Sequence, residues 1–316
     1  MFQVLFFDFF ILGGIALSFW LTGYFLHHNS CKSKKPYPCW LMAVIVLIPG
    51  LILIYGSFIE PRMIVVREYD YSFPEEKALK VPKKVVLISD THVGPYKKRD
   101  FSTRVVNRIA ELEPDLILMA GDYFLGDYAN EARYHIEPYG ELPLIAPTIA
   151  VLGNHAFRVG IPGKHMPNYE EADDVRSALN DLNILGLEDA VAKFFDEDPI
   201  YIVGAQDIWS EADDFESIDL PDRSKRTIVI SHNPDLILRA QDKVDLVVSG
   251  HTHGGQIRLP FIGPLAKPGP TQLPRNTFKG NSKWGETTLQ VTSGLGESGP
   301  RARLFNPPEI VLMTLR

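Results

Sequence analysis

Cysteine is almost absent from this chain of 316 residues: it has two, Cys31 and Cys39, and none in residues 61–316. The large C-terminal part therefore contains no disulfide, no cysteine nucleophile and no thiolate metal ligand. Two alternatives remain for these cysteines, a Cys31–Cys39 disulfide or two unpaired thiols, and we favour the unpaired thiols. The redox compartment does not follow from the sequence.

Charge is scarce in the first 60 residues. The charged side chains there are Asp8, Lys32, Lys34, Lys35 and Glu60. The rest of the chain has more acidic than basic residues, and the whole chain has a formal net charge of −7. Such an acidic balance lacks the basic surface that non-specific nucleic-acid binding requires, so we expect no nucleic-acid partner.

Two long hydrophobic runs occupy this poorly charged segment, at residues 2–25 and 40–59. About 20 apolar residues span the hydrocarbon core of a bilayer as a helix. The alternative for the first run is a cleaved signal peptide, but it lacks a basic start and a clear small-residue cleavage site. The alternative for the second is a buried core helix, but it has no polar face. We predict that residues 1–60 form a membrane anchor of two transmembrane helices.

Lysines between the two runs predict the orientation of this anchor. Lys32, Lys34 and Lys35 lie in the connecting loop, and cytoplasmic loops are enriched in Lys and Arg. The loop is therefore expected in the cytoplasm, with both ends of the anchor and the C-terminal domain on the extracytoplasmic side. Arg62 and Arg67 follow the second run and reduce this asymmetry.

From residue 61 the sequence alternates as an α/β domain does, with a linker and first strand at 61–84 and the main domain at 85–316. Short apolar runs predict buried strands, and apolar residues at helical spacing predict helices. The predicted strands are 85–88, 116–119, 149–152, 201–203, 227–230, 246–248, 287–292 and 310–314; the predicted helices are 101–112 and 170–182.

Polar residues of only a few kinds follow five of these strands. In chain order they are Asp90, His92, Asp122, Asn154, His155, His232, His251 and His253. In α/β folds the carboxyl ends of the strands form the ligand crevice. Carboxylate and amide oxygens with imidazole nitrogens suit Mn²⁺, Fe, Zn²⁺ or Mg²⁺. Two such ions, with Asp122 bridging them through its two oxygens, would clamp the attacking and leaving oxygens of an in-line displacement.

Taken in order, these motifs resemble those of the calcineurin-like metallophosphoesterases. The segments 231–235, 250–256, 293–296 and 308–310 look like those of the bacterial YkuE/YaeI-type branch. The resemblance covers roughly residues 84–316. It implies a four-layer αββα sandwich, a bacterial membrane location once the anchor is included, and two divalent metal ions, with Mn²⁺ as the first choice.

The same resemblance implies the ligands. One ion would take Asp90, His92, Asp122 and His253; the other would take Asp122, Asn154, His232 and His251. His155 would lie beside the substrate phosphate, where it stabilises charge or protonates the leaving oxygen.

Two departures from the family pattern bear on His155. Ala156 and Leu125 stand where many members have an acidic residue, and Asp127 is a candidate substitute. Weaker candidates are His135 and His165, expected to be solvated loop residues, and Arg158, Arg301 and Arg303, which could bind a phosphate or an anionic head group.

We therefore expect a membrane-anchored hydrolase that cleaves a phosphomonoester, phosphodiester or pyrophosphate by attack of a metal-bridging hydroxide. An anchored enzyme suits a lipid-linked or envelope-associated substrate. Two alternatives stay open: a UDP-diacylglucosamine-type pyrophosphatase of lipid A synthesis, which requires a cytoplasmic catalytic face, and a catalytically weak metal-binding scaffold. The sequence names neither the substrate-binding residues nor the oligomeric state.

Overall fold

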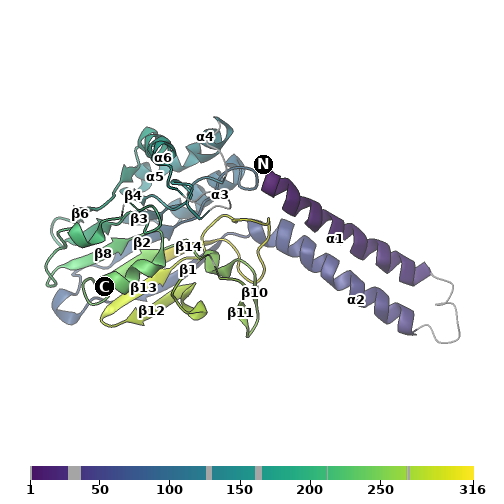
Figure 1. Ribbon diagram of the computed structural model, residues 1–316. Helices are drawn as coiled ribbons and strands as arrows, with labels where there is room; N and C mark the ends of the chain where they lie inside the picture. Colours follow the sequence, from purple (N-terminus) through teal and green to yellow (C-terminus); the bar gives the residue numbers. More distant parts are fainter. Residues whose placement is uncertain are drawn as a thin grey trace.

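The computed structural model describes residues 2–27, 37–125, 130–160, 166–211, 213–267, 269 and 271–316. A pair of long helices projects from a domain built on two sheets (Figure 1). Some residues discussed above lie outside the described part, namely Cys31, Lys32, Lys34, Lys35, Asp127 and His165.

The projecting pair consists of α1 (Phe2–His27) and α2 (Tyr37–Ile54), and α2 continues through a π-helical turn and a 3-10 turn to Arg62. The helices pack closely where Gly50 faces Ser18, since a Cβ atom on Gly50 would lie 2.4 Å from the Ser18 hydroxyl. Small residues allow such close packing between membrane helices. Cys39 is disulfide-bonded, so the expectation of an unpaired thiol is wrong for this residue.

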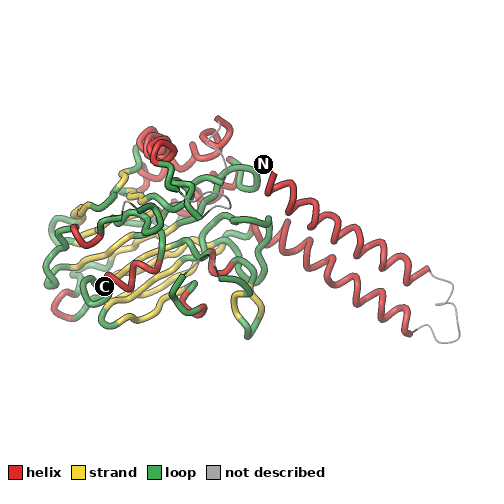
Figure 2. Tube along the Cα trace, in the orientation of Figure 1, coloured by secondary structure: helices red, strands yellow, loops and turns green. Residues whose placement is uncertain are grey.

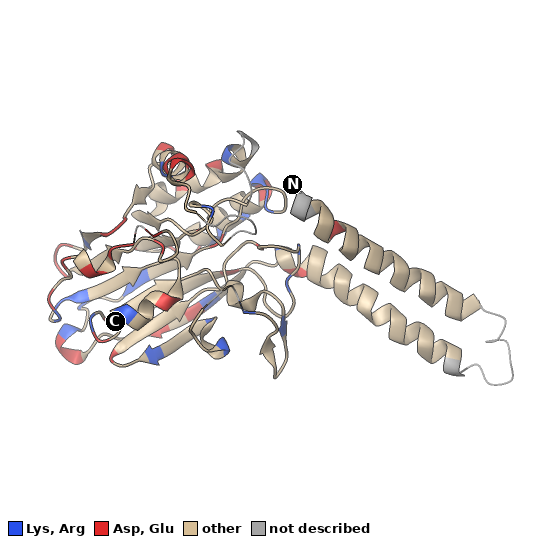
Figure 3. Ribbon diagram, viewed as in Figure 1, with Lys and Arg blue, Asp and Glu red and all other residues tan. Residues whose placement is uncertain are grey.

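Residues 5–27 and 39–62 are long and apolar enough to cross a membrane, by length and composition. Only 17% and 22% of their most apolar windows are buried within the protein. Lys, Arg, Asp and Glu are spread over the domain but almost missing from the two helices (Figure 3). A core helix of a soluble protein would be mostly buried, so that alternative does not fit the second run.

The described part of the domain contains two six-stranded sheets with parallel centres. Their strands, yellow in Figure 2, lie in the domain and not in the projecting helix pair. The first has the order β1 (Val65–Tyr71), β14 (Glu309–Leu315), β2 (Lys83–Ile88), β3 (Leu116–Ala120), β4 (Thr148–Val151) and β5 (Leu185–Gly186). The second has the order β12 (Gly280–Trp284), β13 (Thr287–Val291), β9 (Leu246–Ser249), β8 (Arg226–Ile230), β7 (Ile200–Gly204) and β6 (Ala190–Phe194). A small hairpin, β10 (Arg258–Leu259) and β11 (Gly263–Pro264), stands apart.

The central strands are buried on both faces, which explains their continuous apolar runs. In β2, Val86 and Ile88 pack under the helices, whereas Val85 and Leu87 face the second sheet, because alternate side chains point to opposite faces. The helical layer contains α3 (Arg99–Ala110), α4 (Asn130–Ile136), α5 (Leu142–Ile145) and α6 (Tyr169–Asp181).

The outer face of the second sheet is covered by α7 (Ile237–Ala240) and short 3-10 turns. The predicted αββα sandwich is therefore confirmed, with one thin outer layer. All the predicted strands and both predicted helices are present. Strands β6 and β12 were not predicted, because each lies at a sheet edge and has a half-buried, mixed sequence.

Candidate metal centre

The carboxyl ends of strands from both sheets meet at one place. β2, β3 and β4 of the first sheet lead into Asp90, Asp122 and Asn154, and β8 and β9 of the second lead into His232 and His251. Main-chain hydrogen bonds join neighbouring ends: Asp90 N donates to Gly121 O at 2.9 Å, and Gly250 N donates to His232 O at 3.0 Å. All eight site residues expected from the sequence lie in this region, in two clusters and a flanking histidine.

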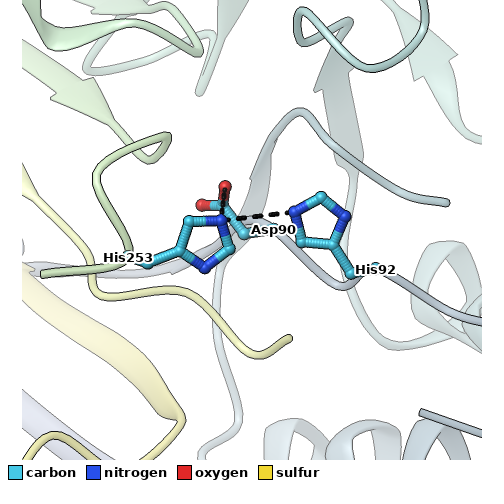
Figure 4. Close-up of side chains that lie close together, drawn as sticks. All are labelled: Asp90, His92 and His253. Carbon is cyan, nitrogen blue, oxygen red and sulfur yellow. Dashed lines mark hydrogen bonds and ion pairs between the residues drawn. The ribbon is translucent and has the colours of Figure 1, made fainter. Parts of the chain in front are cut away.

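The first cluster contains Asp90, His92 and His253 (Figure 4). His253 Nε2 lies 3.3 Å from His92 Nε2 and 3.4 Å from Asp90 Oδ1. The other imidazole nitrogens are held by main-chain carbonyls, since Gly296 O is 3.1 Å from His253 Nδ1 and Phe124 O is 3.3 Å from His92 Nδ1. These contacts turn both Nε2 lone pairs toward the same point.

The second cluster contains Asp122, Asn154, His232 and His251. Asn154 Oδ1 lies 3.1 Å from His232 Nε2 and 3.0 Å from His251 Nδ1, and the two nitrogens are 3.2 Å apart. His232 Nδ1 is held by Ala120 O at 2.7 Å. Acceptor atoms packed this closely repel one another unless a proton or a cation lies between them. Ligands about 2.1 Å from one cation are separated by roughly these distances.

Asp122 joins the two clusters through a single oxygen. Its Oδ2 lies 3.1 Å from His232 Nε2 and 3.8 Å from His92 Nε2. Its Oδ1 accepts a hydrogen bond of 2.9 Å from the main-chain N–H of His155. Oδ2 therefore faces the histidines of both clusters, and the expectation that Asp122 bridges two ions through its two oxygens stays a prediction.

Electrostatics favour the metal-binding forms of most of these side chains. Burial lowers the pKa of both His92 and His251 to about 3, so they are neutral and can donate a lone pair. Burial opposes the charge on Asp122, but His232 and His155 hold its pKa well below the usual value. Burial alone would lower the pKa of His232, but Asp122 raises it to about 10. A divalent ion held by His232 would therefore have to displace a proton from it.

The backbone is strained where it presents the ligands. Five ligand-bearing residues have positive φ angles, which costs about 1–3 kcal/mol for a residue with a side chain. They are Asp90 (50°), His92 (42°), Asp122 (55°), His251 (65°) and His253 (48°). Close packing also explains the glycine before His251, because a Cβ atom on Gly250 would lie 1.9 Å from the Ser89 hydroxyl. The sharp turns let neighbouring strand ends aim short side chains at a common centre.

A cavity of about 360 Å³ opens beside the two clusters. Asp122 and His155 line its inner part, and Trp209, Ile257, Leu265 and Pro300 line other walls. The His155 side chain is 16% exposed, and its Nε2 is 3.9 Å from Asp122 Oδ2. Sequence reasoning missed Trp209, whose ring centroid is 4.5 Å from that of His251. It follows β7, a strand that was predicted but has no motif at its end.

Several weaker candidates have partners within the protein. Arg303 is completely buried and donates to the carbonyls of Ser293, Gly294 and Gly296, so it holds the loop that orients His253. Arg158 pairs with Glu171 in α6.

The sequence also did not predict the surroundings of Arg301, His135 and Ala156. Arg301 pairs with Asp8 of α1 at 3.2 Å. His135 is buried in α4, so the expectation of a solvated loop residue is wrong. Ala156 is 4% exposed and packs in the helix-side core.

Residues 83–255 match the calcineurin-like phosphoesterase family. The chain belongs to this family. It is 30% identical to the uncharacterized metallophosphoesterase YkuE of Bacillus subtilis, over 83% of this chain and 89% of that protein. It is 27% identical to the phosphodiesterase YaeI of Escherichia coli, over 83% and 92%.

A Chlamydia muridarum protein named UDP-2,3-diacylglucosamine pyrophosphatase LpxG is 26% identical over 86% of this chain and 95% of its own length. An uncharacterized metallophosphoesterase of Helicobacter pylori is 31% identical over 73% of this chain, but this match spans only 59% of that relative. The predicted YkuE/YaeI-type resemblance is confirmed, and the chain is placed among hydrolases of phosphoester bonds.

The side chains of this calcineurin-like phosphoesterase suit a dinuclear divalent centre. Asp90 Oδ1 is buried and has no hydrogen-bond partner, although it points into the first cluster. Carboxylate, imidazole and amide donors without thiolate fit a hard or borderline divalent ion. The donor set does not choose among Mn²⁺, Fe, Zn²⁺ and Mg²⁺.

Proposed function

We propose that this protein is a membrane-anchored, metal-dependent phosphoesterase that hydrolyses a phosphomonoester, phosphodiester or pyrophosphate. Asp90, His92, Asp122 and His253 hold one divalent ion, and Asp122, Asn154, His232 and His251 hold the other, with Mn²⁺ the preferred metal. The position of Asp122 Oδ2 between the two groups of ligand atoms carries this proposal. Two bound cations would neutralise charge on the phosphate and acidify water.

His155 acts on the substrate rather than on the metals. Its main-chain N–H is fixed to Asp122 Oδ1, and its ring lies at the cavity wall beside His92, with ring centroids 4.7 Å apart. Burial lowers the pKa of this imidazole. A bound phosphate brings negative charge close to the ring and favours the protonated form. His155 then donates its proton to the leaving oxygen.

The anchor places the enzyme at a membrane, with the loop between α1 and α2 in the cytoplasm and the catalytic domain on the other side. This favours a lipid-linked or envelope-associated substrate. The second candidate is a pyrophosphatase acting on a UDP-diacylglucosamine-type lipid, favoured by the match to LpxG along 95% of that relative. The two candidates require opposite orientations, because a substrate made in the cytoplasm needs a cytoplasmic site.

A metal-dependent assay of the full-length protein tests the proposal. Metal-free protein in detergent should be inactive, and Mn²⁺ should restore hydrolysis of bis(p-nitrophenyl) phosphate or of a lipid pyrophosphate. Protein that binds two ions per chain but cleaves neither a monoester, a diester nor a pyrophosphate would instead be the metal-binding scaffold. Protease added to intact cells, with any outer membrane opened, should digest the domain. Full protection would favour the pyrophosphatase of lipid A synthesis.

A further inference from the structure

The β10–β11 hairpin carries an exposed apolar tip that the fold does not use. Phe261 is fully exposed, Ile262 is 68% exposed and Leu265, just beyond β11, is 49% exposed. Moving such a side chain from water into an apolar environment is favourable. Grouped apolar side chains left in water usually mark a surface that contacts a partner or a membrane.

The hairpin lies at the end of the domain where the helices join it (Figure 1). Arg258 N in β10 donates to Leu304 O at 2.9 Å, and the neighbouring Arg303 N donates to Gly56 O at the end of α2 at 2.8 Å. Buried Glu60 accepts from Phe305 N at 3.0 Å. A short chain of main-chain contacts thus fixes the hairpin next to the end of a membrane-length helix.

The base of the hairpin also forms a wall of the catalytic cavity. Ile257 directly precedes β10 and Leu265 directly follows β11, and both line the cavity together with Pro300. Asp122 and His155 line the same cavity. The cavity lined by Asp122 and His155 is therefore also lined by apolar residues from the base of the hairpin. A volume of about 360 Å³ is near the lower limit for a drug-sized ligand, so it holds a head group but not a pair of acyl chains.

Basic residues also cluster around Arg62, where the second long helix ends. Arg62, Lys98, Arg104 and Arg301 line a small pocket of about 170 Å³ together with Asp100. Arg62, Lys98 and Arg104 are exposed. Basic side chains near an anionic bilayer surface are attracted to it. The end of the domain that receives the helices therefore combines an apolar tip with a basic rim, as a membrane-contacting face does.

We propose that the tip of the β10–β11 hairpin inserts into the bilayer interface and that the catalytic cavity opens toward the membrane there. The enzyme then takes an amphiphilic phosphoester from the bilayer: the head group enters the cavity along Ile257 and Leu265, while the acyl chains stay in the lipid. The catalytic half of this inference rests on the proposed function, whereas the insertion of the hairpin does not.

Insertion is tested without any activity measurement. Full-length protein with Cys31 and Cys39 replaced by serine carries Phe261→Cys, or in a second sample Ile262→Cys, labelled with the fluorophore NBD. In vesicles of phosphatidylcholine and phosphatidylglycerol, both labels should shift to shorter emission wavelength and be quenched by brominated lipids. Leu144→Cys, at an 86% exposed position in α5, is the matched control and should stay unquenched. Labels at 261 and 262 no more quenched than that at 144 would overturn the insertion.

The route by which a lipid substrate reaches the cavity is tested by comparing hydrolysis rates on a soluble substrate and on a membrane-embedded one. Phe261→Ser with Ile262→Ser should change hydrolysis of bis(p-nitrophenyl) phosphate less than about twofold, because neither side chain lines the cavity. Hydrolysis of a lipid pyrophosphate embedded in vesicles should fall at least tenfold, whereas Leu144→Ser should alter neither rate. Equal rates on the lipid for the double variant and the wild type would overturn the access route. Wild-type protein inactive on both substrates would refute the proposed function and leave the quenching result to decide insertion.

Discussion

Replacing Asp122 by asparagine keeps the shape of the side chain and removes its charge from the point between the two clusters. The asparagine carbonyl can still accept from the His155 N–H, as Asp122 Oδ1 does at 2.9 Å. Its NH₂ group then replaces Oδ2, which lies 3.1 Å from His232 Nε2. An amide NH₂ donates hydrogen bonds and offers no lone pair to a cation, so both proposed ions lose a ligand through one substitution.

The expected loss is larger than that of a single ordinary ligand. At an effective dielectric constant of about 20, two divalent ions about 3.5–4 Å apart repel by roughly 18 kcal/mol. A negative oxygen about 2.1 Å from each ion attracts each by roughly 16 kcal/mol. Without that oxygen, the second ion meets mainly repulsion. We expect Asp122→Asn to bind at most about one ion per chain and to lose more than about 10³-fold in turnover.

Metal content and steady-state hydrolysis are measured together on Asp122→Asn and on a matched control. Asp235→Asn is suitable, because Asp235 is also buried and accepts from Thr271 and Gln272 in a separate hydrogen-bond group. The control should retain two ions and near wild-type turnover. Two tightly bound ions in Asp122→Asn, with unchanged activity, would refute the shared-oxygen assignment.

Three further outcomes follow from other buried groups. His155→Ala should retain both ions but lose roughly 10²–10⁴-fold in rate on an unactivated ester; loss of the metals would contradict its assignment to the substrate. Lys77→Met should destabilise the fold by about 1–3 kcal/mol in denaturant titration, because Asp245 loses the partner now 2.6 Å away and keeps only Arg223 at 3.7 Å and the Thr227 N–H at 2.8 Å; no measurable change would show that the pair is dispensable. Burial raises the pKa of Asp207 to about 7, so the folded state keeps a proton that the unfolded chain releases near pH 4, and this residue lowers stability as pH rises from about 4 to 7. Asp207→Asn should therefore raise the melting temperature more at pH 8 than at pH 5, and an equal shift at both would contradict the assignment.

The identity and order of the site residues could be predicted from sequence because strand ends in an α/β domain are local features. A strand buried on both faces appears as a continuous apolar run, and the residue after the run lies at the crevice whatever the rest of the fold does. Asp90, Asp122, Asn154 and His232 were found in this way. Helices α1 and α2 could be predicted from the apolar composition of their segments alone, since only 17% and 22% of their most apolar windows are buried within the protein.

The edge strands and the residues around the site could not be predicted, because their roles depend on distant partners. Strands β6 and β12 are defined by pairing with a neighbour. Their burial alternates along the strand, but their sequences, AVAKF and GNSKW, do not alternate between apolar and polar residues and so give a weak pattern. Arg303 resembled a phosphate ligand in the sequence. Only the folded loop shows that its guanidinium donates to main-chain carbonyls, because arginine offers the same N–H donors to a phosphate and to a carbonyl.

The sequence by itself determined which atoms could bind metal, because ligand type is a property of each side chain. Tertiary structure decided how those atoms are shared. His251 N donates to Asp90 Oδ2 across 161 residues of sequence, at the junction of two sheets that only core packing brings together. At that junction Asp122 Oδ1 accepts from the His155 N–H, and Oδ2 faces the histidines of both clusters. Packing also sets the base of the β10–β11 hairpin beside the cavity, since adjacency in space is not fixed by order along the chain.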